Sequence, residues 1–300
     1  PFFSFIIVKL ASPETCWRWM FASELLPVVV FIVLLMTIPQ SPRWLAGRGR
    51  HDEALAVLVR VDGEANAREE MEQIQASLKE ELGTFSELFA PGIRYAFAIG
   101  LFLAFFNNWT GWSVMGGYIP MLFESSGLND RALAILQFAV AYGFMGAVTL
   151  VACWIVDRVG RRPLWLAGSA MMCVITAMTG AVFHFHLSGW FVLLVIILCT
   201  LPHGFALGPL PWLMMSEIFP TRLRGRAVSL TTAFLWVTIY SGAQLFPIIS
   251  DYSERTIGSI GGTFWLLSFI CVFAFLFGLF MLPETKGRSL EEIAASWKRK

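Results

Sequence analysis

Five stretches of this 300-residue chain contain no Asp, Glu, Lys or Arg, namely residues 95–123, 132–156, 163–216, 227–250 and 256–283. A helix needs about 20 residues to cross a bilayer core of roughly 30 Å, and an uncharged apolar run of that length is typical of such a span. Only 14% of the residues are charged, against about 25% in an average soluble chain. The pattern excludes a soluble enzyme, a nucleic-acid-binding protein and a disordered chain, and it predicts an all-α integral membrane protein.

The uncharged runs predict seven complete transmembrane helices. Four of the runs are each long enough for one span, and the apolar residues 21–38 predict another. The run 163–216 is too long for one crossing, so it predicts two spans that separate at the polar residues 184–189. Residues 1–10 have the composition of the end of a further helix. Because the chain starts with Pro, without an initiator Met or a charged leader region, we expect a fragment whose upstream part is missing.

The positive charges predict how these helices are oriented. If the segment after residues 21–38 is cytoplasmic, eighteen of the 22 Lys and Arg residues fall on the cytoplasmic side, and the other four are Lys9, Arg18, Arg131 and Arg255. Short cytoplasmic loops carry an excess of Lys and Arg. We therefore expect a multi-pass protein of the cell membrane (plasma or inner membrane) whose C-terminus is cytoplasmic.

One charged segment, residues 48–90, interrupts the apolar pattern. A helix is expected from His51 to Val61, and a second is indicated by an apolar stripe at helical spacing, formed by Met71, Ile74, Leu78 and Leu82. Two pairs fit helix N-cap signals, Asn66 with Glu69 and Thr84 with Glu87. The segment is expected to lie against the cytoplasmic face, either as a plain tether or as a latch between two helical bundles.

Four short strings at the predicted cytoplasmic helix ends combine acidic and basic residues: PQSPRWL at 39–45, DRVGRRP at 157–163, SEIFPTRLRGRA at 216–227 and PETKGR at 283–288. An Arg near a helix C-terminus meets the negative end of the helix dipole, and an Arg–carboxylate pair can bridge two helices. Such pairs can lock one face shut and break when it opens; the alternative is simple positive-inside anchoring. The candidate gating residues are Arg43, Asp157, Arg158, Arg161, Arg162, Glu217, Arg224 and Glu284.

Together these strings resemble the signatures of the sugar porter family of the major facilitator superfamily. The family patterns are a PESPRWL-like string after the sixth helix, DRxGRRP after the eighth, GPxPW with SEIFPTRLRGRA around the tenth, and PETKGRSLEEI after the twelfth. This chain reads PQSPRWL, DRVGRRP, GPLPWLMMSEIFPTRLRGRA and PETKGRSLEEI. Gln40 stands where the family pattern has Glu, which implies that a salt bridge made there is missing or weakened.

The resemblance covers nearly the whole chain and implies a truncated helical bundle of the major facilitator type. Residues 1–38 would hold the end of helix 5 and helix 6, residues 39–92 a cytoplasmic helical linker, and residues 93–300 the six-helix C-terminal half with a short cytoplasmic tail. Helices 1–4 of the N-terminal half would be absent. The family's coupling acid, where present, lies in the first of these missing helices.

A solute site is expected near the bilayer midplane, where transporter helices are often broken. The span 190–215 contains Pro202, Pro209 and Pro211, which remove backbone donors and free carbonyl groups. His203 is the only ionisable side chain well inside the last six spans, and by resemblance it falls at a pocket position that is usually aromatic. It is read either as a pocket residue or as a neutral imidazole bonded to a backbone carbonyl. Trp212 offers an apolar face and one N–H donor.

Further amides and aromatic residues complete the candidate substrate-binding set. At least one of the adjacent Asn107 and Asn108 should point into the bundle, because an amide that faces lipid is costly. Where the family often has QQxSGxN, this chain reads NNWTGWS, so Ser113 replaces an Asn. Trp236 matches the Trp of a family Asn-Trp pair, whose Asn is Leu235 here. Gln244, like Gln137, is either a pocket group or a hydrogen bond between helices.

These features indicate a secondary active transporter that works by alternating access. A charged solute would find no counter-ion in the last six spans, so a neutral sugar or polyol is favoured, with a proton as the candidate co-transported ion. The alternatives are a carrier of another small organic metabolite and a non-transporting nutrient sensor, although only 18 residues follow Leu282 and sensors carry long tails. The expected partners are the solute, the lipid bilayer and the missing N-terminal half, with no nucleic acid.

An enzyme is not expected, because no convergent nucleophile, base or set of metal ligands is evident. His184 and His186 are close in sequence but have no third ligand nearby. The five cysteines show no paired spacing, and four of them fall inside spans, so neither a disulfide framework nor a zinc site is indicated. We expect no cofactor and no metal ion.

Overall fold

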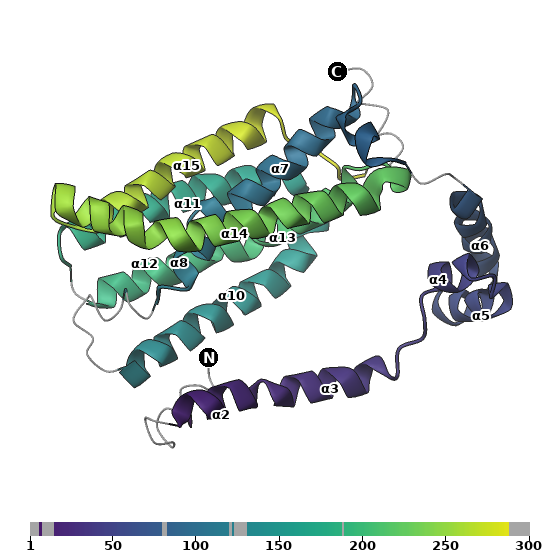
Figure 1. The fold of residues 1–300 in the computed structure, drawn as a ribbon, viewed down its shortest axis with the longest axis horizontal. Helices are drawn as coiled ribbons and strands as arrows, with labels where there is room; N and C mark the ends of the chain where they lie inside the picture. The colour runs from purple at the N-terminus through teal and green to yellow at the C-terminus, as the bar shows by residue number, and fades with distance from the viewer. Residues whose placement is uncertain are drawn as a thin grey trace. The chain divides into compact units, whose positions relative to one another are not determined.

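The computed structural model describes residues 6–7, 15–79, 83–119, 122, 131–187 and 189–287. All secondary structure in these ranges is helical. The chain divides into two compact units: residues 10–83, which we call the amino-terminal unit, and residues 1–9 with 84–300, which we call the bundle unit (Figure 1). The predicted helix end at residues 1–10 and the tail after Gly287 lie largely outside the described residues.

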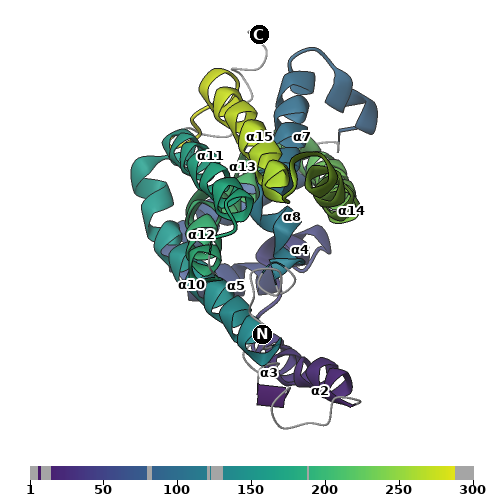
Figure 2. The same ribbon diagram turned by 90° about the vertical axis from the view of Figure 1, so that its left-hand side faces the viewer.

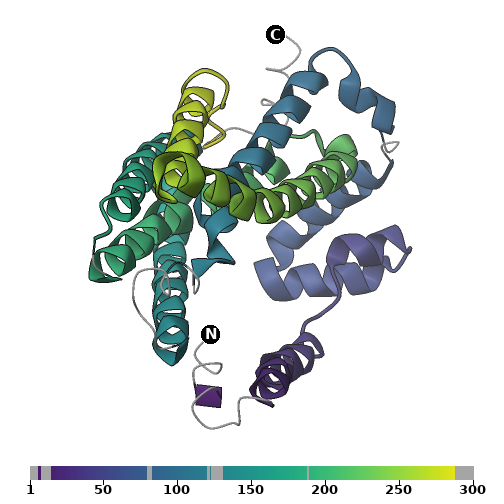
Figure 3. The same ribbon diagram turned by 60° about the vertical axis from the view of Figure 1, so that its left-hand side comes forward.

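The amino-terminal unit begins with two apolar helices, α2 (Cys16–Ser23) and α3 (Leu25–Leu35), which together form a candidate membrane span of 20 residues. Three further helices form a separate small cluster (Figure 3), namely α4 (Pro42–Gly47), α5 (His51–Asp62) and α6 (Glu64–Lys79). The core of this cluster contains Leu45, Ala46, Ala54, Leu58, Ala67 and Met71. Most of the apolar run predicted at 21–38 is therefore helical, and three short helices follow it.

The predicted linker helices are confirmed with one correction. Helix α5 matches the expected segment, and Met71 and Ile74 of α6 pack in the cluster core. Asn66 is not a helix N-cap: α6 begins at Glu64, because Gly63 adopts a φ of +81° that ends α5 and allows the next helix to start at once. The side chain of Leu78 and the whole of Leu82 lie outside the described residues.

The bundle unit consists of long helices that run side by side (Figure 1). In chain order its elements are the 3₁₀-helix η1 (Phe85–Phe89), α7 (Ile93–Trp109), α8 (Trp112–Gly116), α10 (Arg131–Val159), α11 (Arg161–His184), α12 (Gly189–Pro202), the π-helical turn η2 (His203–Leu207), α13 (Pro209–Glu217), α14 (Thr221–Ile257) and α15 (Gly261–Phe280). The Thr84–Glu87 capping box at the start of η1 is present, as predicted, with Thr84 N donating to Glu87 Oε1 at 2.8 Å.

Six described helical segments are long and apolar enough to cross a membrane. The predicted separation at residues 184–189 is correct, because α11 ends at His184 and α12 begins at Gly189. Helix α14, the long green helix in Figure 3, extends beyond the predicted run 227–250 at both ends. Pro247 lies inside this helix. The span predicted at 95–123 is not one continuous helix: α7 ends at Trp109 and α8 starts at Trp112.

Glycines let α11 and α15 approach closely, as Figure 2 shows end-on. A Cβ on Gly278 would lie 2.4 Å from Trp165 Cδ1, and a Cβ on Gly180 would lie 2.5 Å from the Trp265 ring. Trp165 is fully buried, and its Nε1 donates to Ala274 O at 2.8 Å. Small residues replace the hydrophobic driving force that membrane helices lack, because they allow close van der Waals packing and hydrogen bonds between helices.

The interruption between α7 and α8 depends on Gly111. Its φ is +127°, a conformation that L side chains rarely adopt, and a Cβ there would lie 3.1 Å from Thr176 Cγ2. A Cβ added to Gly143, in the middle of α10, would have no atom within 4 Å apart from its chain neighbours and the backbone of its own helix.

We expect Gly111→Ala to lower the free energy of unfolding by about 1–3 kcal/mol, because the new side chain is held in a strained backbone conformation. The measurement is chemical denaturation of the full-length protein in detergent. Gly143→Ala is the matched control and should leave stability unchanged or slightly improved. Equal stabilities of the two variants would contradict the role given to Gly111.

Candidate functional site

Two adjacent carboxamides at the end of α7 bond to different neighbours. Asn107 Nδ2 donates to Leu207 O at 2.9 Å and to Gly208 O at 3.1 Å, at the junction of η2 and α13. Asn108 Nδ2 donates to Thr238 Oγ1 of α14 at 3.0 Å. Successive residues of an α-helix point about 100° apart, which lets neighbouring amides reach different helices. Both side chains therefore point into the bundle, where their N–H donors bind protein groups.

Ser113 and His203 lie around the same interruption. Ser113, on α8, donates from Oγ to Asn107 O at 3.3 Å, across the break after α7. His203 opens the π-turn and is 9% exposed, and its Nδ1 is buried without a hydrogen-bond partner among the described residues. The expected alternative of a bond to a backbone carbonyl is therefore not realised at Nδ1.

The aromatic ring of Trp112 lies beside His203. The ring centroid of Trp112 lies 6.4 Å from that of His203 and 5.6 Å from that of Tyr142, on α10. Two more buried polar atoms have no described hydrogen-bond partner. They are Nε1 of Trp109, at the end of α7, and Oε1 of Gln137, on α10. Sequence reasoning did not assign roles to Trp109, Trp112 or Tyr142; the only signal was the presence of aromatic residues beside amides inside a span.

The structure does not bring the other predicted substrate-binding residues into this buried group. Trp212, on α13, is 46% exposed, and Trp236, on α14, is 62% exposed. Gln244, two turns further along α14, is exposed as well. Their side chains lie on accessible faces of the bundle unit.

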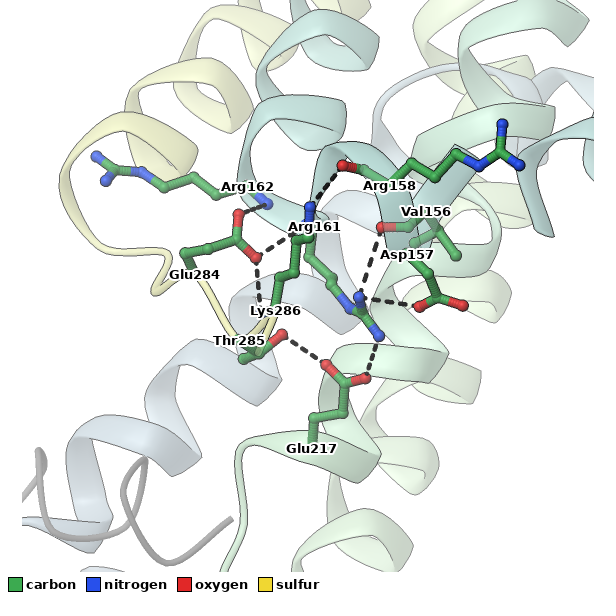
Figure 4. Close-up of polar contacts among 9 residues, drawn as sticks. All are labelled: Val156, Asp157, Arg158, Arg161, Arg162, Glu217, Glu284, Thr285 and Lys286. Atoms are coloured by element: carbon green, nitrogen blue, oxygen red, sulfur yellow. Dashed lines mark hydrogen bonds and ion pairs between the residues drawn. The ribbon is translucent and has the colours of Figure 1, made fainter. Parts of the chain in front are cut away.

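A second polar cluster, the Arg161 network, lies where α10, α11 and α13 end or begin (Figure 4). Arg161 donates from Nη2 to Glu217 Oε1 at 2.8 Å and from Nη1 to Asp157 Oδ1 at 3.1 Å. Thr285 Oγ1 donates to the other carboxylate oxygen of Glu217 at 2.6 Å. The Arg161 side chain is only 12% exposed and that of Glu217 21%, so this pair is shielded from water. Charged hydrogen bonds of this kind are short and strong.

Glu284 binds the first turn of α11. Its carboxylate accepts hydrogen bonds from the backbone N–H groups of Arg161 at 3.1 Å and Arg162 at 3.2 Å. A carboxylate at a helix N-terminus satisfies unpaired N–H groups and meets the positive end of the helix dipole. Gly160, with a φ of +100°, leaves room for it, because a Cβ there would lie 2.7 Å from Glu284 Oε2.

The remaining predicted gating residues contribute in other ways. The Arg158 guanidinium points away from the network (Figure 4), and its backbone carbonyl accepts a hydrogen bond from Lys286 Nζ. Arg162 Nε donates to Gly278 O of α15 at 3.2 Å. Arg224 is half-buried in the first turn of α14, where Arg222 pairs with Glu87 of η1.

Arg43 belongs to the amino-terminal unit, where it is exposed on α4. In the same unit Arg50 pairs with Glu53 at 2.7 Å and donates to Gln40 Oε1 at 3.4 Å. The hydrogen bond from Arg50 holds the pKa of Glu53 below its ordinary value. The neutral Gln40 therefore accepts a hydrogen bond from Arg50, where a glutamate would form an ion pair with it. Glu53 is the carboxylate that neutralises Arg50 instead.

A cavity of about 340 Å³ lies at the opposite ends of α11 and α14 from the Arg161 network. It is lined by residues that include Tyr118, Phe183, His186, Phe246, Asp251 and Glu254. Within the described ranges, no cluster of His, Cys, Asp and Glu is arranged to hold a metal ion. None of the predicted substrate-binding residues lines this cavity.

Comparison with known proteins identifies the family. Residues 2–297 match the family described as sugar (and other) transporter. The chain is 39% identical over 292 residues to an arabinose-proton symporter of Bacillus subtilis, covering 95% of this chain and 60% of that protein. It is 32% identical over 283 residues to a D-xylose-proton symporter of Escherichia coli, covering 94% of this chain and 57% of that protein. The chain thus spans about 60% of the length of these relatives.

The fold also resembles that of solved sugar transporters. A solved structure of the major facilitator superfamily proton:xylose symporter XylE, bound to 6-bromo-6-deoxy-D-glucose, superimposes with a TM-score of 0.83 at 31% identity. The match covers 98% of this chain and 62% of that one. The matched family and relatives are multi-pass membrane transporters rather than enzymes. The chain therefore belongs to the sugar porter family of the major facilitator superfamily.

Proposed function

We propose that the full-length protein is a secondary active transporter of a neutral sugar or polyol that works by alternating access. A proton is the proposed co-transported ion. The observation that carries the proposal is the 39% identity to an arabinose-proton symporter over nearly the whole of this chain. The proposed location is the cell membrane, with the C-terminus in the cytoplasm, since this orientation places most Lys and Arg residues inside.

The interior of the bundle unit suits a neutral, hydroxyl-rich solute. The uncharged runs leave no Asp, Glu, Lys or Arg deep in these helices, and a buried charge without a partner is costly. His203 Nδ1, Gln137 Oε1 and Trp109 Nε1 are buried polar atoms without described partners. Buried polar groups are normally hydrogen-bonded, so such atoms favour a ligand or water that supplies hydroxyl groups.

The proposed solute contacts come from two kinds of residue. His203 and Ser113 are polar groups beside the interrupted helices. Trp212, Trp236 and Gln244 present accessible aromatic faces and an amide on α13 and α14. Asn108 would reach a solute through its carbonyl oxygen, or after a change of conformation, because its N–H donors are bound to protein groups here. The N–H donors of Asn107 are bound to protein carbonyl groups as well.

We propose that the Arg161 network holds the cytoplasmic ends of α10, α11 and α13 together while that face is closed. Arg161 joins the turn between α10 and α11 to the end of α13 through Glu217. Thr285 ties the segment after α15 to the same carboxylate. Separation of these helix ends on opening would break charged hydrogen bonds that are shielded from water. These bonds therefore stabilise the closed conformation relative to the open one.

Transport itself is the first prediction. Full-length protein in liposomes should accumulate labelled pentose or hexose, or a polyol, when the outside is made acidic, and a protonophore should abolish the accumulation. A sugar acid of similar size should not be transported, since the interior offers no counter-ion. Absence of flux across a panel of sugars, polyols and small metabolites would contradict the proposal and favour the sensor alternative.

We expect His203→Ala to raise the KM for the transported solute about 3- to 10-fold, the size of one hydrogen bond, without loss of folding. The readout is initial uptake rate against solute concentration, with thermal unfolding as the test of folding. His51→Ala, at the start of α5, is the matched control and should leave the KM unchanged. An unaltered KM in the His203 variant would remove this residue from the site.

We expect Glu217→Gln to lower stability by about 1–2 kcal/mol, between the values of exposed and fully buried pairs, and to shift the protein towards a state open to the cytoplasm. The measurements are denaturation and the labelling rate of a cysteine placed on the cytoplasmic side. Asp251→Asn breaks the exposed pair with Arg255, whose side chains are 65% and 79% exposed, and it should change little. Indistinguishable effects of the two substitutions would refute the gating role.

A further inference from the structure

Two helices of the bundle unit are interrupted, and the interruptions touch. Helix α7 ends at Trp109, before Gly111, and the helix from Gly189 onward is broken by the π-turn His203–Leu207. Asn107, near the end of α7, links the first interruption to the second, because its Nδ2 donates to Leu207 O at 2.9 Å and to Gly208 O at 3.1 Å. These residues are about 100 positions apart in the sequence, so the contact exists only in the fold.

At the second interruption, between η2 and α13, one backbone N–H donor is missing. In an α-helix the N–H of each residue donates to the carbonyl four positions earlier, and proline has no N–H. Leu207 O is the carbonyl to which residue 211 would donate, but residue 211 is proline. Leu207 is fully buried, and a buried carbonyl without a partner is costly, above all in a bilayer. The Asn107 amide supplies the donor that Pro211 lacks.

The donors of Asn107 are fully used by these bonds. A carboxamide NH₂ has two hydrogens, and Asn107 Nδ2 lies at normal hydrogen-bond lengths from two carbonyl oxygens. Asn107 is only 7% exposed. Its own backbone carbonyl accepts from Ser113 Oγ at 3.3 Å, which ties α8 to the same point. The Asn107 side chain thus joins both interrupted helices, and its backbone carbonyl holds α8 at the same place.

We propose that Asn107 is a positioning residue, which couples the two interrupted helices by donating to the carbonyl groups at the η2–α13 junction in place of Pro211. The two interruptions then move as one when the bundle changes conformation. The effect of this coupling on transport rests on the proposed function, whereas the coupling between the two helices depends only on the fold. Asn108 is the natural comparison, because its donors go to Thr238 and Leu235 on α14.

A double-mutant cycle in the full-length protein tests the coupling. Asn107→Leu keeps the branched shape and the number of heavy atoms of the side chain and removes both donors, and we expect it to lower Tm by about 2–4 °C. Pro211→Ala restores an N–H opposite Leu207 O, so in that background Asn107→Leu should cost less than half as much. Asn108→Leu should cost the same with and without the Pro211→Ala substitution. Asn107→Ala repeats the cycle in case leucine does not fit.

Equal costs of the Asn107 substitutions in both backgrounds would overturn the proposal. Transport separates positioning from solute binding: we expect Asn107→Leu to reduce the maximal rate about 10-fold while KM changes less than about 3-fold. Pro211→Ala should recover part of that rate. A large rise in KM that Pro211→Ala does not reverse would also overturn the proposal, in favour of direct solute contact. If the wild-type protein moves no solute but the stability cycle shows coupling, the proposed function fails and the positioning role stands.

Discussion

A backbone carbonyl at bilayer depth has no water to bind, so every interruption of a membrane helix must be satisfied by another part of the protein. This constraint governs the centre of the bundle unit. Asn107 donates to Leu207 O and Gly208 O, and the Cys271 thiol of α15 donates to Thr110 O at 3.2 Å. The breaks that give the bundle its irregular backbone are therefore held by side chains from other helices. Because each hydrogen bond joins particular residues, each break is fixed at one position in its helix.

The bundle separates neutral from charged polar groups. Among the described residues, its interior contains amides, hydroxyls, indoles and the imidazole of His203, whereas ion pairs lie at helix ends, as between Arg161 and Glu217 or Arg255 and Asp251. Full charges are tolerated at the ends because water and helix dipoles are near, and they are excluded from the middle by the cost of removing them from water. Under the proposed function, a neutral solute would meet hydrogen-bonding groups with no fixed charge nearby. The ion pairs at the helix ends would form and break as that face closes and opens.

Much of the fold could be predicted from local sequence. The break at residues 184–189, the helix over His51–Asp62 and the capping box at Thr84 follow from short-range polarity and helix-capping chemistry. The break within the span expected at 95–123 was not predicted, because a hydrophobic run does not reveal that Gly111 takes a positive φ beside Thr176. Asn66 was misplaced for a similar reason, since Gly63 alone ends one helix and starts the next. Backbone conformation at single glycines depends on neighbours that the pattern does not contain.

The sequence by itself determined the class of protein, the approximate spans, the likeness to sugar porters and the residue types available at each helix end. Length and charge suffice for these, because a bilayer selects uncharged runs and a helix end selects capping charges. The tertiary structure decided which atoms meet. It directed the Asn107 donors to the η2–α13 junction, left Nδ1 of His203 without a described partner and placed Thr285 on Glu217. Such contacts join residues that are tens to hundreds of positions apart, and only the packing of whole helices brings them within hydrogen-bonding distance.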